Sequence, residues 1–334
     1  MTDPDGRGLA DVVVVGGGAA GLSTALVLGR ARRSVLVVDA GRPRNGVAEH
    51  MHGTLSRDTT PSGDYLAAGR GELARYDVAV DTGEATSAAP EAGGGGDGRG
   101  PWAVTLSDGS AVRGRRLVVA TGLVDELPDL PGLTPLWGRD VLSCPYCHGW
   151  EIADQPFALL ATAPGHLARA VLLTGWSSRV RVFLHHVDRD QLGPAALATA
   201  AAAGVELVDG PVRELVTTRG RLSGVRLDSG DEYAHAVLFI VPTLTPRTGL
   251  LTDLGAATDP GGWPVVDATG ATSLGGVWAV GNTVDSSHKV IHAAAHGATA
   301  AQAINEDLLR TDLAQLATIP AVEEPDTAAG ANLR

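Results

Sequence analysis

The sequence predicts an α/β protein with two domains, and three observations support this fold class. The chain has 334 residues, more than one ordinary hydrophobic core requires. A valine-rich segment from Asp11 to Val15 leads into a glycine-rich turn, a helical pattern and a second strand. A similar alternation of strands and helices begins again at Phe157. We therefore expect two sheets, each packed against helices.

The first unit has the pattern of a dinucleotide-binding fold. A strand over Asp11–Val15 is followed by Gly16-Gly17-Gly18-Ala19-Ala20-Gly21, a helix over Leu22–Arg32 and a strand over Ser34–Val38. The glycines at 16, 18 and 21 allow the tight turn, admit a pyrophosphate to the helix N-terminus, and let helix and strand pack closely. Asp39 is placed to accept hydrogen bonds from ribose hydroxyls. A chance glycine turn is the alternative, but the acid at the expected offset favours dinucleotide binding.

Hydrophobic periodicity and turn residues predict the other elements. We expect a loop over Arg42–Thr60, whose His50 and His52 could face a cofactor but are more typical of solvated positions. Prolines in Leu127–Gly132 indicate a crossing between domains, and the chain beyond Thr318 is typical of a loose tail. No function is assigned to the low-complexity turn 93–100. The predicted helices are Gly63–Tyr76, His166–Thr174, Pro194–Ala203 and, capped by Ser286 and Ser287, about His288–Leu309. The predicted strands include Arg116–Ala120, Phe157–Ala161, Val180–Leu184 and Gly276–Asn282. Four further strands are expected to complete one mixed sheet: Val205–Val208, Leu215–Thr217, Gly224–Leu227 and Ala236–Val241.

Composition excludes several classes of function. A net charge of −12 argues against nucleic acid as a partner, because its backbone needs a basic surface. No apolar signal segment and no long apolar run occur, so we expect neither secretion nor a membrane partner. The expected location is the reducing cytoplasm.

The only two cysteines, Cys144 and Cys147, form a Cys-x-x-Cys pair. A tight turn leading into a helix lowers the pKa of one thiol, and His148 follows as a neighbour that could give or take a proton. The pair is therefore interpreted as a redox disulfide. A zinc site would need a second pair of ligands, and an inert buried pair is a further alternative. Three histidines at 288, 292 and 296 could share a helix face, but no carboxylate or cysteine completes a metal site, so no metal is predicted.

These motifs together resemble the thioredoxin reductase family of FAD flavoproteins. The segments that carry the resemblance occur in family order along most of the chain: Gly16–Gly21, Val119–Gly122, Cys144–Cys147 and Gly276–Asn282. The resemblance implies two Rossmann-like, doubly wound domains, the second inserted in the first. The FAD domain would comprise 1–124 and 245–318, and the inserted domain 125–244, with a flexible tail at 319–334. It also implies a homodimer.

Carried over by position, the resemblance implies the residues that bind FAD. Asn282 stands where the family usually has Asp, and an amide can still donate and accept there. The N-terminus of the late helix would favour the anionic reduced flavin. The implied FAD-binding residues are Gly16, Gly18, Ala19, Ala20, Gly21, Asp39, Ala120, Thr121, Gly122, Gly281, Asn282, His288, Lys289 and Val290.

The second nucleotide site departs from the family pattern. Ala161 and Ala163 replace glycines that would admit a pyrophosphate, and His166 fills the close-packing position. The basic cluster for a 2'-phosphate is replaced by His185-His186-Val187-Asp188. We therefore expect that NADPH does not bind.

Cys144-Pro-Tyr-Cys-His-Gly-Trp-Glu151 resembles a branch of dithiol oxidases that close disulfides in microbial natural products such as holomycin, gliotoxin and romidepsin. The resemblance implies oxidation of a small-molecule dithiol through the cysteines and FAD, with O2 as final acceptor and H2O2 as product. Cys144 would exchange with substrate, Cys147 would react with the flavin, and His148 would be the base, with His288 or Lys289 as weaker candidates. The alternatives are a thioredoxin-disulfide reductase using NADPH or another donor such as ferredoxin, and a flavin-binding scaffold without catalysis.

Overall fold

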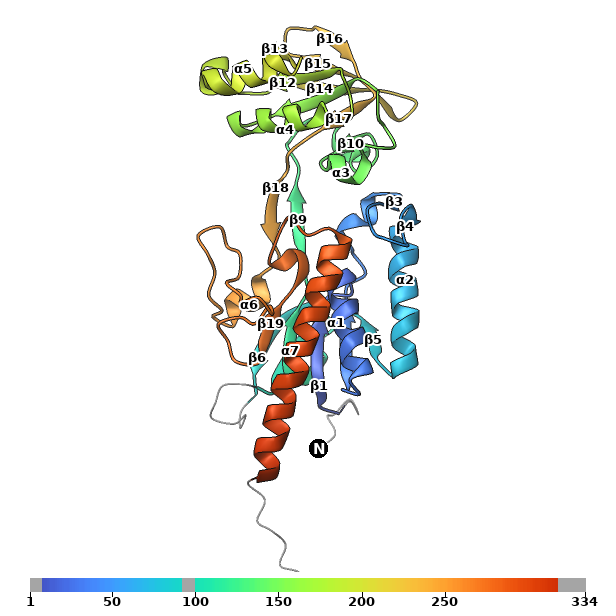
Figure 1. The fold of residues 1–334 in the computed structure, drawn as a ribbon, viewed down its shortest axis with the longest axis vertical. Helices are drawn as coiled ribbons and strands as arrows, with labels where there is room; N and C mark the ends of the chain where they lie inside the picture. Colours follow the sequence, from blue (N-terminus) through green and yellow to red (C-terminus); the bar gives the residue numbers. More distant parts are fainter. Residues whose placement is uncertain (1–7, 92–99, 318–334) are drawn as a thin grey trace, which may run out of the picture.

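A computed structural model describes residues 8–91 and 100–317 and shows two halves joined by a two-stranded ribbon (Figure 1). The predicted tail at 319–334 and most of the predicted turn at 93–100 lie outside the described residues. Each half contains a parallel sheet with helices against it, as expected for an α/β protein. No helix in the described ranges is both long and apolar enough to cross a membrane.

The first half is built on a seven-stranded sheet with the order β5-β2-β1-β8-β7-β6, in which β19 also pairs with β8. Val12, Val13 and Val14 of β1 are fully buried, because this strand lies between parallel neighbours and is covered on both faces. The strands are β1 (Ala10–Val15), β2 (Val35–Asp39), β5 (Ala79–Thr82), β6 (Ala85–Pro90), β7 (Trp102–Leu106), β8 (Ala111–Val119) and β19 (Val277–Ala279).

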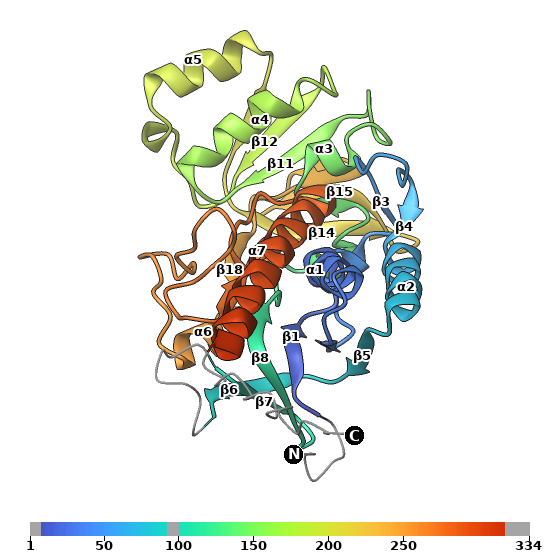
Figure 2. The ribbon, with the colours of Figure 1, turned by 60° about the horizontal axis from the view of Figure 1, so that its bottom comes forward.

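Helices α1 (Ala19–Arg30), α2 (Ser62–Leu73) and α7 (Val290–Ala317) lie together in this half, and α6 (Gly249–Asp253) packs beside the sheet elsewhere (Figures 1 and 2). The backbones of α1 and α7 approach closely. A Cβ at Gly297 would lie 2.2 Å from the Ala20 carbonyl oxygen, and the Thr24 hydroxyl donates a hydrogen bond to the Gly297 carbonyl (3.1 Å). This contact fixes the long helix over the glycine turn.

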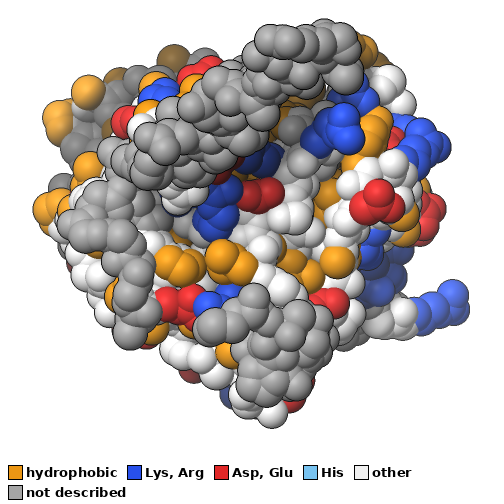
Figure 3. Space-filling view, turned by 90° about the horizontal axis from the view of Figure 1, so that it is seen from below, with side chains coloured by type: hydrophobic (Ala, Val, Ile, Leu, Met, Phe, Trp, Pro, Cys, Tyr) orange, Lys and Arg blue, Asp and Glu red, His pale blue; other side chains and the backbone are white. Residues whose placement is uncertain are grey.

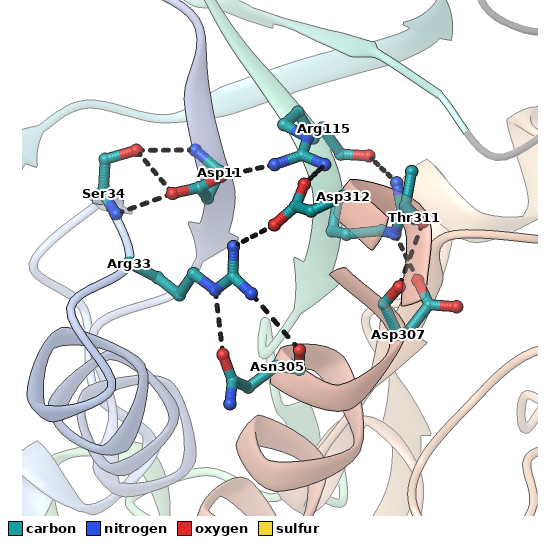
Figure 4. A network of polar contacts seen from close by, with 9 residues as sticks. Asp11, Arg33, Ser34, Arg115, Asn305, Asp307, Thr311 and Asp312 are labelled. Atoms are coloured by element: carbon teal, nitrogen blue, oxygen red, sulfur yellow. Dashed lines mark hydrogen bonds and ion pairs between the residues drawn. The ribbon is translucent and has the colours of Figure 1, made fainter. Parts of the chain in front are cut away.

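Polar contacts tie the far end of α7 to the sheet (Figure 4). Arg33 donates to Asp312 (2.7 Å), which also pairs with Arg115, while the buried Arg116 donates to Asp307 (2.6 Å). Figure 3 shows the molecule from this end, with basic and acidic side chains next to one another. These pairs explain why the helix continues to Ala317 rather than ending at Leu309 as predicted.

The start of α7 also differs from the prediction. The helix begins at Val290, so His288 lies before it, and the Lys289 amide donates to His292 Nδ1 (3.3 Å) instead of to a serine cap. The predicted start of α1 is also late, because Gly18 is already the extended residue that precedes the helix. The predicted loop after β2 contains two short paired strands, β3 (His50–Met51) and β4 (Thr60–Pro61).

The second half contains a five-stranded parallel sheet with the order β10-β17-β11-β12-β13. Helices α4 (Leu167–Leu173) and α5 (Pro194–Ala202) share one apolar cluster with it. The predicted single mixed sheet is wrong, because the other face is covered by a separate antiparallel sheet with half-exposed strands. The strands are β10 (Val141–Leu142), β11 (Phe157–Ala161), β12 (Val180–Leu184), β13 (Glu206–Asp209) and β17 (Val237–Phe239), with β14 (Val212–Thr218), β15 (Arg221–Leu227) and β16 (Glu232–Ala234) in the separate sheet.

The ribbon between the halves consists of β9 (Leu123–Glu126) and β18 (Thr243–Pro246), paired antiparallel. The predicted domain boundaries, 124/125 and 244/245, both fall within it. The predicted crossing at Leu127–Gly132 is wrong, because Leu130 is already buried in a core cluster of the second half. The prolines there shape a segment of that half, and the chain crosses one strand earlier.

Candidate active site

A single cavity of about 1160 Å³ runs from the carboxyl ends of β1 and β2 to the cysteine pair. Both halves of the molecule line it. All residues predicted as catalytic or FAD-binding are among its lining residues except Gly21 and Gly281. The fold therefore brings together side chains that are up to 274 positions apart in sequence, from Gly16 to Val290.

The glycines of the turn at one end of the cavity differ in the space around them: two are tightly packed and one is open. A Cβ at Gly16 would lie 2.3 Å from the Ala120 carbonyl oxygen, and one at Gly21 would lie 1.9 Å from the Gly16 carbonyl oxygen. A Cβ at Gly18, by contrast, would have no neighbour within 4 Å. No side chain caps the N-terminus of α1, and its first turn has no acidic residue. This arrangement suits an anionic ligand that approaches the backbone at Gly18.

Asp39, at the end of β2, lies beside the glycine turn. Its carboxylate accepts from the Gly41 amide (3.2 Å) and from Arg70 Nη1 (3.4 Å). A Cβ at Gly17 would come within 2.6 Å of this carboxylate. Asp39 is therefore held at the cavity wall, with its side chain partly exposed.

Asn282 organises the approach to α7. Its Nδ2 donates to the carbonyl oxygens of Asp285 (2.8 Å) and His288 (2.9 Å), and its Oδ1 accepts from Arg44 (3.2 Å). Arg44 also makes a bidentate pair with Asp125 of the ribbon (2.8 and 2.7 Å). An aspartate at 282 could not donate to the two carbonyls, which gives this departure from the usual family residue a structural reason.

His288 presents an unsatisfied nitrogen at the cavity. Its Nε2 lies 3.5 Å from Asp285 Oδ2, while its Nδ1 is buried without a hydrogen-bond partner in the described protein. Burial alone would raise the pKa of Asp285, but hydrogen bonds from Ser287 and the charges of His288 and His292 hold it below its usual range. The carboxylate thus lies beside one ring nitrogen, and the other is left without a partner among the described residues.

The three histidines do not form a metal centre. The ring centroid of His288 lies 6.1 Å from that of His292 and 5.4 Å from that of His296. His296 Nδ1 accepts from the Gly281 amide (3.2 Å), so His296 supports the turn before α7. Residues 8–91 and 100–317 contain no cluster of three His, Cys, Asp or Glu side chains able to hold a metal ion.

The redox turn, residues 143–151, carries a closed disulfide between Cys144 and Cys147, whose Cα atoms are 5.3 Å apart. Cys144 is the extended residue before α3 (Pro145–His148), and the Cys147 amide donates to its carbonyl oxygen (3.2 Å). The predicted redox pair is thus placed in one turn at the cavity wall. Tyr146 and Trp150 of this turn are exposed, at 59% and 84%.

His148 is adjacent to Cys147 and half-buried. Burial lowers the pKa of His148 and the nearby His52 lowers it further, while Glu151 opposes the shift. The imidazole is therefore biased toward the neutral form that can accept a proton. His52 lines the same cavity, but the sequence alone did not assign it a role.

Comparisons with known proteins agree with this arrangement. Residues 10–298 match the model of the pyridine nucleotide-disulphide oxidoreductase family. The chain belongs to this family. Thioredoxin reductase tcpT of Claviceps purpurea is 29% identical to it over 312 residues, covering 90% of this chain and 95% of that protein.

Solved structures give the same result for the fold. The crystal structure of HlmI has a TM-score of 0.89 and 43% identity, covering 95% of this chain and 97% of that one. An oxidoreductase from Agrobacterium tumefaciens has a TM-score of 0.82 and 33% identity, covering 91% and 99%. The predicted resemblance to thioredoxin reductases and the predicted α/β fold class are confirmed, and the chain is an oxidoreductase of this type.

FAD, the cofactor of thioredoxin reductases, fits the cavity of this family member. Features at both ends suit it: the open backbone at Gly18, which is also the uncapped N-terminus of α1 beside Asp39, and the buried partnerless Nδ1 of His288. They occur in the cavity that also contains the disulfide. A long ligand with a central pyrophosphate would meet a suitable group at each end.

The corresponding turn of the second half, from Ala161 to His166, differs from the first. Ala161 is fully buried, and the Thr162 amide donates to Nδ1 of His166 (3.3 Å). Burial and the nearby Arg169 lower the pKa of His166, which favours the neutral, accepting imidazole. An amide that would face a phosphate is thus paired with a side chain of the turn itself, and these residues do not line the main cavity.

Proposed function

We propose that the protein is an FAD-dependent dithiol oxidase that forms an intramolecular disulfide in a small-molecule natural product, with O2 as final electron acceptor and H2O2 as product. The observation that carries the proposal is the closed Cys144–Cys147 disulfide, with the half-buried His148 beside it, at one end of a cavity whose other end suits a dinucleotide. Similarity to HlmI and to tcpT supports it.

The chemistry of the redox turn is two successive thiol–disulfide exchanges. One substrate thiolate attacks Sγ of Cys144, the enzyme disulfide breaks, and Cys147 leaves with the electron pair. The second substrate thiolate attacks the substrate sulfur of the mixed disulfide, which closes the product ring and releases Cys144. The substrate loses two electrons and two protons, and the cysteine pair gains both electrons. His148 takes a substrate proton because it is held neutral beside the reacting sulfurs.

The cofactor would be held by the residues of the cavity wall. The Gly18 backbone and the α1 N-terminus would bind its pyrophosphate, Asp39 a ribose, and Asn282, His288, Lys289 and Val290 the region near the redox turn. When bound, FAD supplies a two-electron acceptor that O2 can reoxidise with release of H2O2. We infer no step that uses NADPH, because the Thr162 amide, which would face a phosphate, already donates to Nδ1 of His166.

A thioredoxin-disulfide reductase fed by NADPH or by another donor such as ferredoxin is the second candidate. The exposed rings of Tyr146 and Trp150 favour it, because they offer a protein substrate an apolar surface next to the cysteines. The homodimer is an expectation carried by the family resemblance, and the cytoplasmic location is an expectation from the sequence alone.

An anaerobic titration tests the proposal. The purified flavoprotein is treated first with NADPH and then with dithiothreitol, and the absorbance of oxidised flavin is followed. Bleaching by dithiothreitol alone, with recovery and H2O2 release in air, supports the oxidase. Prompt bleaching by NADPH overturns it in favour of the reductase. A Cys147→Ser variant should bind flavin and be inactive, and an active variant would contradict the exchange scheme.

A further inference from the structure

His52 joins the first half of the molecule to the redox turn. It follows β3, and β3 lies next to α3 (Figure 1). Its side chain is only 13% exposed, and its Nδ1 lies 3.3 Å from Glu151 Oε1 and 3.6 Å from Asp58 Oδ1. Glu151 belongs to the redox turn, whereas Asp58 belongs to the same loop as His52. The imidazole therefore bridges two carboxylates that come from different halves.

The loop is built to hold this bridge. The Asp58 carboxylate also accepts from the Gly53 amide (2.8 Å), which fixes it beside His52. Gly53 has a positive φ of 71°, so the chain turns sharply directly after His52. The same imidazole nitrogen thus faces a carboxylate of its own loop and a carboxylate of the redox turn.

The His52 contact lies close to His148, the residue assigned as base. The ring centroids of His52 and His148 are 6.4 Å apart and the rings meet edge to face. The charged groups that act on His148 in the described structure are His52, from the loop after β3, and Glu151, from the redox turn. They act in opposite directions, because a cation nearby disfavours protonation of His148 and an anion favours it.

We propose that His52 is a positioning residue for dithiol oxidation: paired with Glu151 and Asp58, it holds the redox turn and brings an ionisable ring to 6.4 Å from the ring of His148. This inference rests on the proposed function, because it assigns His148 the role of base. His52 itself need not touch the substrate. Its action is transmitted through charge and through the position of the turn.

The His52→Asn variant separates the polar contact with Glu151 from the charge. The amide nitrogen of Asn can take the place of Nδ1 toward Glu151, but it cannot carry a proton charge. Without a charge at this position, the pKa of His148 should rise, because the nearby His52 is one of the causes that lower it. His148 would then be protonated at pH values where the parent enzyme has a free base.

The experiment measures reduction of the enzyme disulfide, without turnover in air. Parent holoenzyme, His52→Asn and a His186→Asn control are mixed anaerobically with dithiothreitol between about pH 5 and 8.5. Acid quenching, alkylation and mass spectrometry then report the free thiols of Cys144 and Cys147. His186 is exposed on the second half and has a positive φ of 58° that asparagine tolerates, so it is a matched substitution.

Dividing the variant rate by the parent rate removes the pH dependence that comes from the ionisation of dithiothreitol. For His52→Asn we expect a ratio near 1 at alkaline pH that falls to about one third to one tenth at acid pH, and a flat ratio for the control. A ratio for His52→Asn that does not change with pH overturns the inference, whatever its size, because a purely structural loss would be uniform. Failure of dithiothreitol to reduce the parent disulfide at any pH would instead remove the proposed function itself.

Discussion

Lys289 Nζ lies 4.4 Å from the centroid of the Tyr146 ring, above the aromatic face. Lys289 immediately precedes α7 in the first half, and Tyr146 belongs to α3 in the second. With the His52–Glu151 contact, the redox turn is thus held from two sides by the half that would carry the flavin. The Lys289 contact depends on a charge, so it can be tested by a substitution that preserves shape.

Lys289→Met should weaken the hold on the redox turn. The substitution keeps the length of the side chain and removes the cation, and a cation–π contact of this kind contributes about 0.5 to 1 kcal/mol. We expect flavin bleaching by dithiothreitol to slow by about twofold to fivefold, measured anaerobically by stopped-flow absorbance. Tyr146→Phe is the control, because it retains the ring face. Equal slowing in both variants would show that the contact is not electrostatic.

Gly18→Ala and Gly21→Ala should fail for different reasons. The Cβ at Gly18 points into open space, so the flavin-free protein should melt at the parent temperature while its affinity for FAD falls by about tenfold or more. The Cβ at Gly21 would lie 1.9 Å from a backbone oxygen, so this variant should lose about 3 kcal/mol of stability or fail to fold. Urea unfolding of apoprotein and fluorescence titration with FAD measure the two effects. An unaltered FAD affinity for Gly18→Ala would contradict the assigned pyrophosphate site.

The sequence was most informative where function rests on consecutive residues. The run from Asp11 to Asp39 predicted a strand, a glycine turn, a helix and a second strand. It could do so because hydrophobic periodicity and glycine positions depend on the local backbone conformation. The Cys144–Cys147 turn was predicted for the same reason. Element boundaries were less accurate, because distant ion pairs such as Arg115–Asp312 extend α7 beyond its local signal.

The residues that sequence reasoning missed are those whose partners lie far away in the chain. His52 is 99 positions from Glu151, and Arg44 is 81 positions from Asp125 and 238 from Asn282. No periodicity connects such pairs, and a loop histidine alone is typical of a solvated position. The separate antiparallel sheet was missed because strand patterns do not state which sheet a strand joins.

Asn282→Asp tests why this chain departs from the usual family residue. The Asn282 amide donates hydrogen bonds to two carbonyl oxygens. An ionised carboxylate has no proton to donate, so both hydrogen bonds would be lost and the charge would be repelled by the carbonyl oxygens. We expect a loss of about 1 to 3 kcal/mol in the free energy of unfolding, measured by urea denaturation of the apoprotein. Asn282→Ala, which removes the donor without adding charge, should be less destabilised than Asn282→Asp. The proposal would be wrong if the aspartate variant were as stable as the parent.

The protonation state of His148 should determine how the rate of disulfide reduction depends on pH. The group must be neutral to take a proton, and its pKa lies below the ordinary imidazole value of about 6.5 because of burial and the charge of His52. The base form therefore predominates at neutral pH, and it is lost as the pH falls through the lowered pKa. We expect the rate of Cys144–Cys147 reduction by dithiothreitol, divided by that of His148→Asn, to stay constant down to below about pH 6.5 and then to fall. A ratio that already declines between about pH 8 and 7 would require a base with a raised pKa, which His148 in this environment does not have.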